Sequence, residues 1–152
     1  MNREILKEQI KRHEGEVLEV YADSLGYLTL GVGHLIKEGD NEHGQPAGTP
    51  VSQSTVDAYY ESDFDKHVDE TIHVFESKGG KDFYSLPEDI QHVLVNMTFN
   101  LGGSRFGKFN NMWKGVVSED WEKVAVEMED SRWFKQVGRR SVELQEMVRS
   151  CV

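Results

Sequence analysis

The 152 residues carry 27 acidic and 17 basic side chains, a formal net charge of −10, with 38% hydrophobic residues. This composition fits a globular fold with its own core, either one unit or two lobes that share a core. The charge argues against nucleic-acid binding, and the single Cys151 excludes an intrachain disulfide. No stretch reaches the roughly 20 apolar residues of a membrane span, and the N-terminus has no signal-like apolar segment.

The negative charge is concentrated in the first two thirds of the chain. Residues 1–99 hold 19 acidic and 8 basic residues, whereas residues 100–152 hold 8 and 9. An acidic front half has no general attraction for an anionic polymer, so we expect such a substrate to be held by local contacts. We also expect salt or divalent cations to assist by screening the repulsion.

The first predicted element is a helix over residues 2–13. Asn2 can cap its start, and apolar residues follow at helical spacing. Gly15 is a natural residue just beyond a helix C-terminus. Glu14 is therefore expected in the last turn, held by a rigid element.

A small antiparallel hairpin is predicted next. Residues 17–21 and 27–32 are short and β-prone, and a turn sequence containing Asp23 separates them. Residues 37–50 are rich in loop-forming residues and are expected to hold at most a fragment of a third strand.

The rest of the chain is predicted to be helical. Ser52 can cap a helix of about 25 residues, with an apolar stripe that runs from Val56 through Ile72 to Phe75. A further helix is predicted to start at Pro87 and to end at Gly102, and a short one is predicted around residues 106–116. Ser118 can cap the next helix. A segment at 131–134 and a last helix from about Arg140 to Cys151 complete the chain.

These elements predict a single α+β domain over residues 1–152. The expected parts are a small sheet lobe at about 15–51, a linking helix at about 52–77, and a larger helical lobe. The helical lobe comprises residues 78–152 together with the helix at 2–13.

The chemistry-bearing residues cluster near the N-terminus, in the spacing Glu14-x8-Asp23-x5-Thr29. Two carboxylates held apart on a small scaffold suit acid/base hydrolysis of a sugar linkage. Each residue also has a purely structural explanation. Glu14 fits a solvated helix end, Asp23 an ordinary turn, and Thr29 an ordinary strand position.

This spacing, followed by Gly31-Val32-Gly33-His34-Leu35, resembles the phage-type lysozymes, glycoside hydrolase family 24. Later landmarks match the family in the same order: Asp63, Asn96-Met97-Thr98-Phe99-Asn100-Leu101-Gly102, Trp121 and Ser131-Arg132-Trp133. The resemblance covers nearly the whole chain. It implies a lysozyme-like fold with a cleft between the sheet lobe and the helical lobe.

The resemblance implies hydrolysis of the β-1,4 bond between N-acetylmuramic acid and N-acetylglucosamine in peptidoglycan. Glu14 would be the general acid, and Asp23 with Thr29 would hold the attacking water, which inverts the anomeric carbon. Inverting sites need carboxyl groups about 6.5–9.5 Å apart. No cofactor is expected.

The resemblance also implies supporting residues. His34 would pair with Asp63, although a histidine in this motif also fits a nucleophile or a metal ligand; we expect no metal site because the chain lacks a tight ligand motif. Arg140 would steady Glu14, and Arg139 is an alternative match shifted by one position.

Three residues match positions that line the family's sugar cleft, namely Leu35, Phe99 and Asn100. Phe99 also fits a core position. Trp133 is expected beneath the cleft, and Glu127 stands where the family has an asparagine.

The functional expectation is an endolysin that acts as a monomer on peptidoglycan and causes host lysis. It would remain in the host cytoplasm until a holin releases it to the periplasmic cell wall, without nucleic-acid binding or stable membrane insertion. Two alternatives are a catalytically silent peptidoglycan-binding module and a lysozyme-like module of a phage tail.

Overall fold

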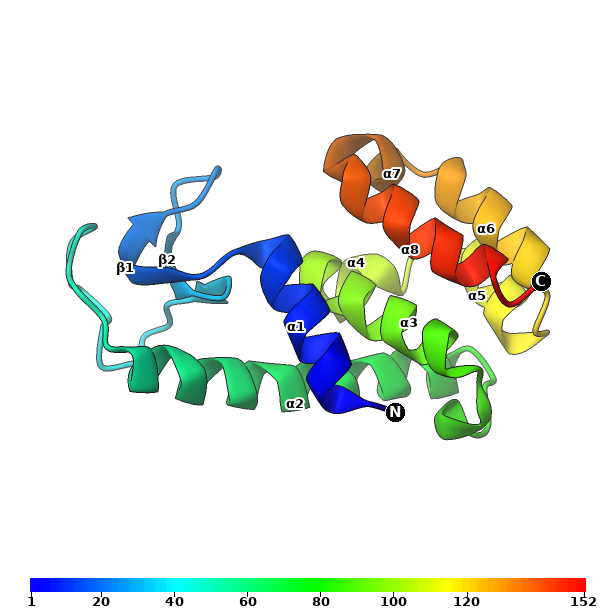
Figure 1. The fold of residues 1–152 in the computed structure, drawn as a ribbon, viewed down its shortest axis with the longest axis horizontal. Helices are drawn as coiled ribbons and strands as arrows, with labels where there is room; N and C mark the ends of the chain where they lie inside the picture. The colour runs from blue at the N-terminus through cyan, green and yellow to red at the C-terminus, as the bar shows by residue number, and fades with distance from the viewer. The chain divides into compact units, whose positions relative to one another are not determined.

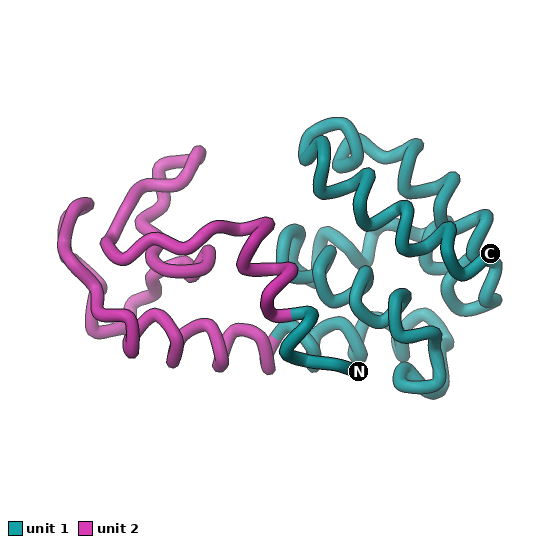
Figure 2. The backbone as a smooth tube through the Cα atoms, viewed as in Figure 1, with its two compact units in different colours: residues 1–6, 67–152 teal, residues 7–66 magenta.

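The computed structural model describes all 152 residues, and the chain divides into two compact units (Figure 2). We call Lys7–Lys66 the sheet unit, and Met1–Leu6 with His67–Val152 the helical unit. The divisions fall inside two helices, α1 (Arg3–Glu14) and α2 (Gln53–Ser77). The lobe boundaries that the sequence suggests at helix ends stay a prediction.

Helix α1 begins and ends as its sequence predicts. The Asn2 carboxamide oxygen accepts a hydrogen bond from Ile5 N at 3.1 Å, which satisfies one of the unpaired amides of the first turn. Gly15 follows the helix with φ +79°, and its amide donates to Lys11 O at 2.8 Å. Glu14 is the last residue of α1.

The sheet has three antiparallel strands in the order β1 (Val17–Ala22), β2 (Leu28–Gly31) and β3 (His34–Leu35). Figure 1 labels the first two. This sheet and the eight α-helices confirm the α+β class. The third strand lies earlier than the expected 37–50 segment. That segment contributes only an isolated bridge, between Glu19 and Pro50, because its turns leave no extended run.

Helix α2 has the predicted length and start. Ser52 Oγ accepts from Thr55 N at 3.2 Å, and the helix runs for 25 residues. Its apolar stripe is buried except at Ile72, which is half-buried. Thr71 and Val74 are buried beside that position, so the buried face is broader than the stripe suggested.

The helical unit is built around one central helix, α3 (Glu88–Leu101). Every residue from Ile90 to Thr98 is buried, so α3 is covered on all sides rather than on one face. The elements around it in sequence are η1 (Phe83–Ser85), α4 (Gly103–Phe106), α5 (Asn110–Val117), α6 (Trp121–Glu129), α7 (Arg132–Val137) and α8 (Arg139–Arg149) (Figure 1). Helix α8 packs against α3, α6 and α7.

Two predicted boundaries in this unit are wrong. Ser118 does not cap the next helix; its hydroxyl donates back to Lys114 O at 2.8 Å and so closes α5. Asp120 is the N-cap of α6, accepting from Lys123 N at 3.1 Å. The helix expected around 106–116 is α5, which begins only at Asn110, because the backbone turns after Phe106, the last residue of α4.

Candidate active site

Glu14 is half-buried at the end of α1, and the turn between β2 and β3 passes close to its carboxylate. A Cβ placed on Gly33 would lie 2.8 Å from Glu14 Oε1, and Gly33 has φ +64°. Both the close approach and the positive φ favour glycine. The backbone at Gly33 therefore forms one wall around the predicted acid, a role that the sequence pattern did not reveal.

Asp23 lies in the turn between β1 and β2, where two amides fix its carboxylate. Leu25 N and Tyr27 N both donate to Asp23 Oδ1 at 2.9 Å. Because both bonds fall on one oxygen, Oδ2 keeps its lone pairs for a donor outside the turn. The side chain is thus oriented by the backbone and still able to accept a proton.

Thr29 occupies the centre of a row of residues across the three strands. It is paired with Tyr21 on β1 and with Leu35 on β3, and directly opposed residues point to the same sheet face. Thr29 is 4% exposed, whereas Leu35 is 46% exposed. The Thr29 hydroxyl donates to Tyr27 O at 3.0 Å, so its oxygen is available as an acceptor.

Tyr21 was not among the predicted site residues. Burial raises the pKa of its hydroxyl, and the negative charges of Glu14 and Asp23 raise it further. Both carboxylates therefore act electrostatically on the same hydroxyl, which stays protonated at neutral pH. The available sequence signal was its place near the end of the predicted first strand, two residues before Asp23.

His34 is held between two carboxylates rather than one. Its Nδ1 lies 2.7 Å from Asp63 Oδ2, the pair that the resemblance implied, and its Nε2 lies 2.9 Å from Asp40 Oδ2. Burial alone would lower the pKa of His34, but the hydrogen bonds to Asp63 and Asp40 outweigh it and raise the pKa. With both ring nitrogens engaged, His34 has neither a nucleophilic nor a metal-binding position left.

The second partner, Asp40, orders the loop that follows β3. Asp40 Oδ2 also accepts from Lys37 N at 2.9 Å; burial opposes its charge, but this bond and His34 lower its pKa. The ring of Tyr59 stacks on His34 with centroids 4.0 Å apart, and its hydroxyl donates to Glu42 at 2.5 Å. The loop is thereby fixed to α2 within the sheet unit.

The remaining predicted site residues lie in the helical unit. The ring centroids of Phe99 and His67 are 4.6 Å apart, and Trp133 Nε1 donates to Asn100 Oδ1 at 2.6 Å. Arg140 Nε donates to Asn96 Oδ1 at 2.9 Å.

The structure also distinguishes the two neighbouring arginines. Arg140 is half-buried and bound to Asn96, while Arg139 is exposed. Arg140 is thus the one that the fold holds in a defined place.

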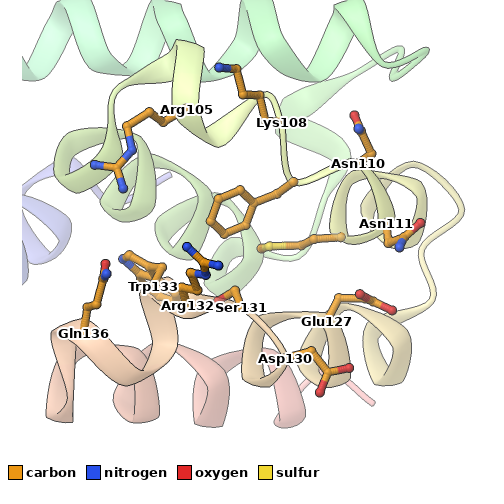
Figure 3. Close-up of a pocket in the computed structure, with 12 residues that line it drawn as sticks. Arg105, Lys108, Asn110, Asn111, Glu127, Asp130, Ser131, Arg132, Trp133 and Gln136 are labelled. Carbon is orange, nitrogen blue, oxygen red and sulfur yellow. The ribbon is translucent and has the colours of Figure 1, made fainter.

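The helical unit contains a pocket of about 460 Å³ near Trp133 (Figure 3). Arg105 and Lys108 lie on one side and Glu127 and Asp130 on the other, as Figure 3 shows. Phe109 and Met112 add apolar side chains to the lining. Since Trp133 also bonds to Asn100, this pocket adjoins that predicted cleft residue. Because side chains of both charges line this pocket, it suits a ligand that has both carboxylate and ammonium groups.

Neither a metal cluster nor a spanning helix is found. No group of three or more His, Cys, Asp and Glu side chains is placed to hold a metal ion. None of the helices is both long and apolar enough to cross a membrane.

Comparison with known families decides the class of protein. Residues 11–149 match the family model described as Phage lysozyme. The chain belongs to the phage lysozyme family. That match includes the end of α1, the whole sheet and nearly all of the helical unit.

Individual relatives of this phage lysozyme family member are distant. It is 29% identical over 150 residues to "Probable T4-type lysozyme 2" of Dictyostelium discoideum, covering 90% of this chain and 88% of the relative. "Probable T4-type lysozyme 1" of the same organism is 28% identical with the same coverage. "Pre-baseplate central spike protein Gp5" of Enterobacteria phage T4 is 30% identical over 90% of this chain but only 26% of that protein.

Membership in the phage lysozyme family makes this chain a glycoside hydrolase of the lysozyme type, with peptidoglycan as the implied substrate. The roles of Glu14, Asp23 and Thr29, and those of the residues predicted to bind or support, stay predictions. The structure places these three in the sheet unit, at the end of α1, in the β1–β2 turn and on β2.

Proposed function

We propose that the chain is an inverting muramidase in which Glu14 is the general acid and Asp23 with Thr29 positions the water. The observation that carries this proposal is the arrangement around Tyr21. Its hydroxyl feels both carboxylates, and it stands in the same cross-strand row as Thr29. Glu14 and Asp23 thus both act on a residue that is the direct cross-strand neighbour of Thr29.

Each proton transfer in this mechanism can be assigned to Glu14, Asp23, water or solvent, without a cofactor. Glu14, as the carboxylic acid, donates its proton to the glycosidic oxygen as the bond to the anomeric carbon breaks. Water attacks that carbon from the opposite face, and Asp23 takes a proton from it. Exchange with solvent then restores a protonated Glu14 and an ionised Asp23.

Hydrogen bonding supports the choice of water ligands. The Thr29 proton is directed to Tyr27 O, and both amide donors of the turn bind Asp23 Oδ1. Thr29 Oγ1 and Asp23 Oδ2 are thus both acceptors. A water that donates one proton to each keeps a lone pair for the attack.

The test compares the wild type with Glu14→Gln on purified peptidoglycan, following the release of reducing ends and, separately, binding. We expect the variant to bind with wild-type affinity and to lose at least about 10³-fold in kcat. Binding by the wild type without reducing-end release would instead support the silent binding module.

We further propose that the pocket beside Trp133 receives the stem peptide of the substrate. Stem peptides carry both carboxylates and ammonium groups, which match Arg105 and Lys108 on one side and Glu127 and Asp130 on the other. Glycan strands with peptides should be cleaved faster than strands stripped of peptides. Equal rates would contradict this assignment.

Two biological settings are compatible with this chemistry. As an endolysin, the protein would wait in the host cytoplasm and depend on a holin to reach the wall as a monomer. The similarity to the spike protein Gp5 favours a second setting, a tail-associated lysozyme. Lysis from within after expression together with a holin, compared with expression alone, separates the two.

The negative charge of the sheet unit predicts that the rate of hydrolysis depends on salt. The unit has 12 acidic and 5 basic residues. Added salt or divalent cations should raise the rate on anionic walls from low ionic strength, because they screen the repulsion. A rate that fell steadily with added salt would contradict it.

A further inference from the structure

We propose that Tyr27 is a substrate-binding residue whose exposed ring stacks against a sugar ring of the glycan, beside the position of the attacking water. Tyr27 was not among the predicted site residues. The inference rests on the proposed function in one respect: Asp23 and Thr29 are taken to hold that water. All three residues belong to the sheet unit.

The backbone of Tyr27 contacts both predicted water ligands. Its amide donates to Asp23 Oδ1 at 2.9 Å, and its carbonyl accepts from the Thr29 hydroxyl at 3.0 Å. One residue therefore orients the carboxylate through its N–H and the hydroxyl through its C=O. A sugar that is attacked by a water between these two groups is bound close to Tyr27.

The strand register puts the Tyr27 side chain on the Thr29 face of the hairpin. The last pair between β1 and β2 joins Ala22 to Leu28. Asp23 N donates to Tyr27 O at 2.8 Å, so the ladder continues for one more pair before the turn. Because side chains alternate along an extended strand, Tyr27 and Thr29, two residues apart, share a face.

Tyr27 is the most exposed aromatic side chain of the protein. It is 59% exposed against 4% for Thr29, so the shared face is closed at Thr29 and open at Tyr27. The Tyr27 ring makes no hydrogen bond, ion pair or ring contact with another residue. Tyr84 is nearly as exposed, at 56%, but its ring packs on Phe83 with centroids 5.5 Å apart. The ring of Tyr27 is thus open to a ligand.

The surroundings of the ring favour a neutral sugar as that ligand. A pyranose ring presents C–H groups on its faces and hydroxyls around its edge. The plane of a tyrosine can cover such an apolar face while its hydroxyl meets the polar edge. The Asp23 carboxylate nearby repels the carboxylates of a stem peptide. The ring therefore suits the glycan itself rather than its peptides.

The ring and the backbone of Tyr27 have separable roles. Replacing the side chain removes the ring but keeps the N–H and C=O that orient Asp23 and Thr29. Loss of the ring should weaken the binding of substrate and transition state alike, which raises KM and leaves kcat. Because the ring makes no contact of this kind within the protein, its loss should leave the free energy of unfolding unchanged.

The experiment measures KM and kcat on soluble peptidoglycan fragments, and urea unfolding, for Tyr27→Ala and Tyr27→Phe. Tyr27→Ala should raise KM about three- to twentyfold with kcat within about twofold, as expected for the loss of one stacking contact. Tyr27→Phe keeps the ring and should stay within about twofold of the wild type in both constants. The matched control is Tyr84→Ala, a tyrosine of similar exposure in the helical unit, which should leave KM unchanged.

Dissociation constants in a Glu14→Gln background give a readout that does not depend on turnover. If the wild type hydrolyses nothing, the proposed function fails while these constants still test Tyr27. Unchanged KM and Kd for Tyr27→Ala would overturn the stacking role, and so would an equal rise for Tyr27→Phe or a fall in kcat alone. The rise should persist on glycan strands stripped of peptides; a rise only on strands with peptides would overturn the sugar as the ligand.

Discussion

His34 in the sheet unit and His92 in the helical unit are both buried, 6% and 4% exposed, but their surroundings differ in charge. Two carboxylates hold His34, and its pKa is raised. His92 Nε2 has no hydrogen-bond partner, its nearest carboxylate oxygen is on Glu88 at 3.6 Å, and burial lowers its pKa. The sheet unit therefore favours the charged form of its buried imidazole, and the helical unit favours the neutral form of its own.

The same contrast runs through the two units as a whole. The sheet unit supplies 8 of the 31 buried apolar residues, and the helical unit supplies the other 23. The part that carries the predicted catalytic residues therefore depends more on polar contacts such as the His34 cluster and the Asp23 turn. The larger core of the helical unit depends on packing, whose stabilisation scales with the apolar area buried.

The largest effect is expected from Asp63→Asn, which removes one partner of the buried His34. At pH 5.5, where His34 is charged, the free energy of unfolding should fall by about 3 kcal/mol. At pH 9 the loss should be smaller, because a neutral imidazole needs the carboxylate less. Urea unfolding at both pH values measures this, with Asp69→Asn on the same helix as the exposed control.

Gly33→Ala tests the wall around Glu14. The new Cβ would meet Glu14 Oε1 at 2.8 Å, so the carboxylate must move, and kcat should drop by about 10- to 100-fold. Gly44→Ala is the matched control, since Gly44 has φ +86° and open space around its Cβ position. Similar losses of stability in both variants, with loss of activity in Gly33→Ala alone, are expected. Wild-type kcat in Gly33→Ala would show that Glu14 is not held there.

A smaller effect is expected for the buried hydroxyl pair of the helical unit. Thr71 Oγ1 lies 2.7 Å from Thr98 Oγ1, and each hydroxyl also bonds a carbonyl of its own helix, His67 O and Leu94 O. Thr98→Val should therefore cost only about 1 kcal/mol, because Thr71 keeps His67 O as an acceptor. A loss above about 3 kcal/mol would mean that this unit also depends on its polar contacts.

The smallest effect concerns pH. The pKa of His92 is lowered in the folded state. Its contribution to the free energy of unfolding is therefore complete above the pKa of an unfolded histidine, about 6.5, and is lost as pH falls. His34 has the opposite sign: its raised pKa makes its contribution complete below about 6.5 and lost as pH rises. His92→Leu should thus flatten the loss of thermal stability between pH 7 and pH 5. A steeper loss of thermal stability in His92→Leu than in the wild type would contradict a lowered pKa for His92.

Much of the fold could be predicted because its signals are local. Asn2, Gly15 and Ser52 mark helix ends through contacts within three or four residues, and the structure has those contacts. The prediction for Ser118 was wrong because a serine hydroxyl can either cap the following helix or donate to a carbonyl of the preceding one, as Ser118 does. Only the path of the chain decides that Asp120 caps α6. The all-round burial of α3 depends on later helices and has no local signal.

The candidate site divides in the same way. Spacing and resemblance were enough to name Glu14, Asp23 and Thr29, and to pair His34 with Asp63. Asp40, Tyr21 and the role of Gly33 required the strand register and the path of the loop after β3. These contacts depend on how segments meet in space, which a hydrophobic pattern does not encode.

The most direct test of the proposed mechanism is the configuration of the product. Proton NMR can follow soluble peptidoglycan fragments during cleavage by the wild type and read the anomer at the new reducing end before mutarotation. If Asp23 and Thr29 hold the attacking water opposite Glu14, the α-anomer forms first from the β-linked substrate. Initial appearance of the β-anomer would contradict the account.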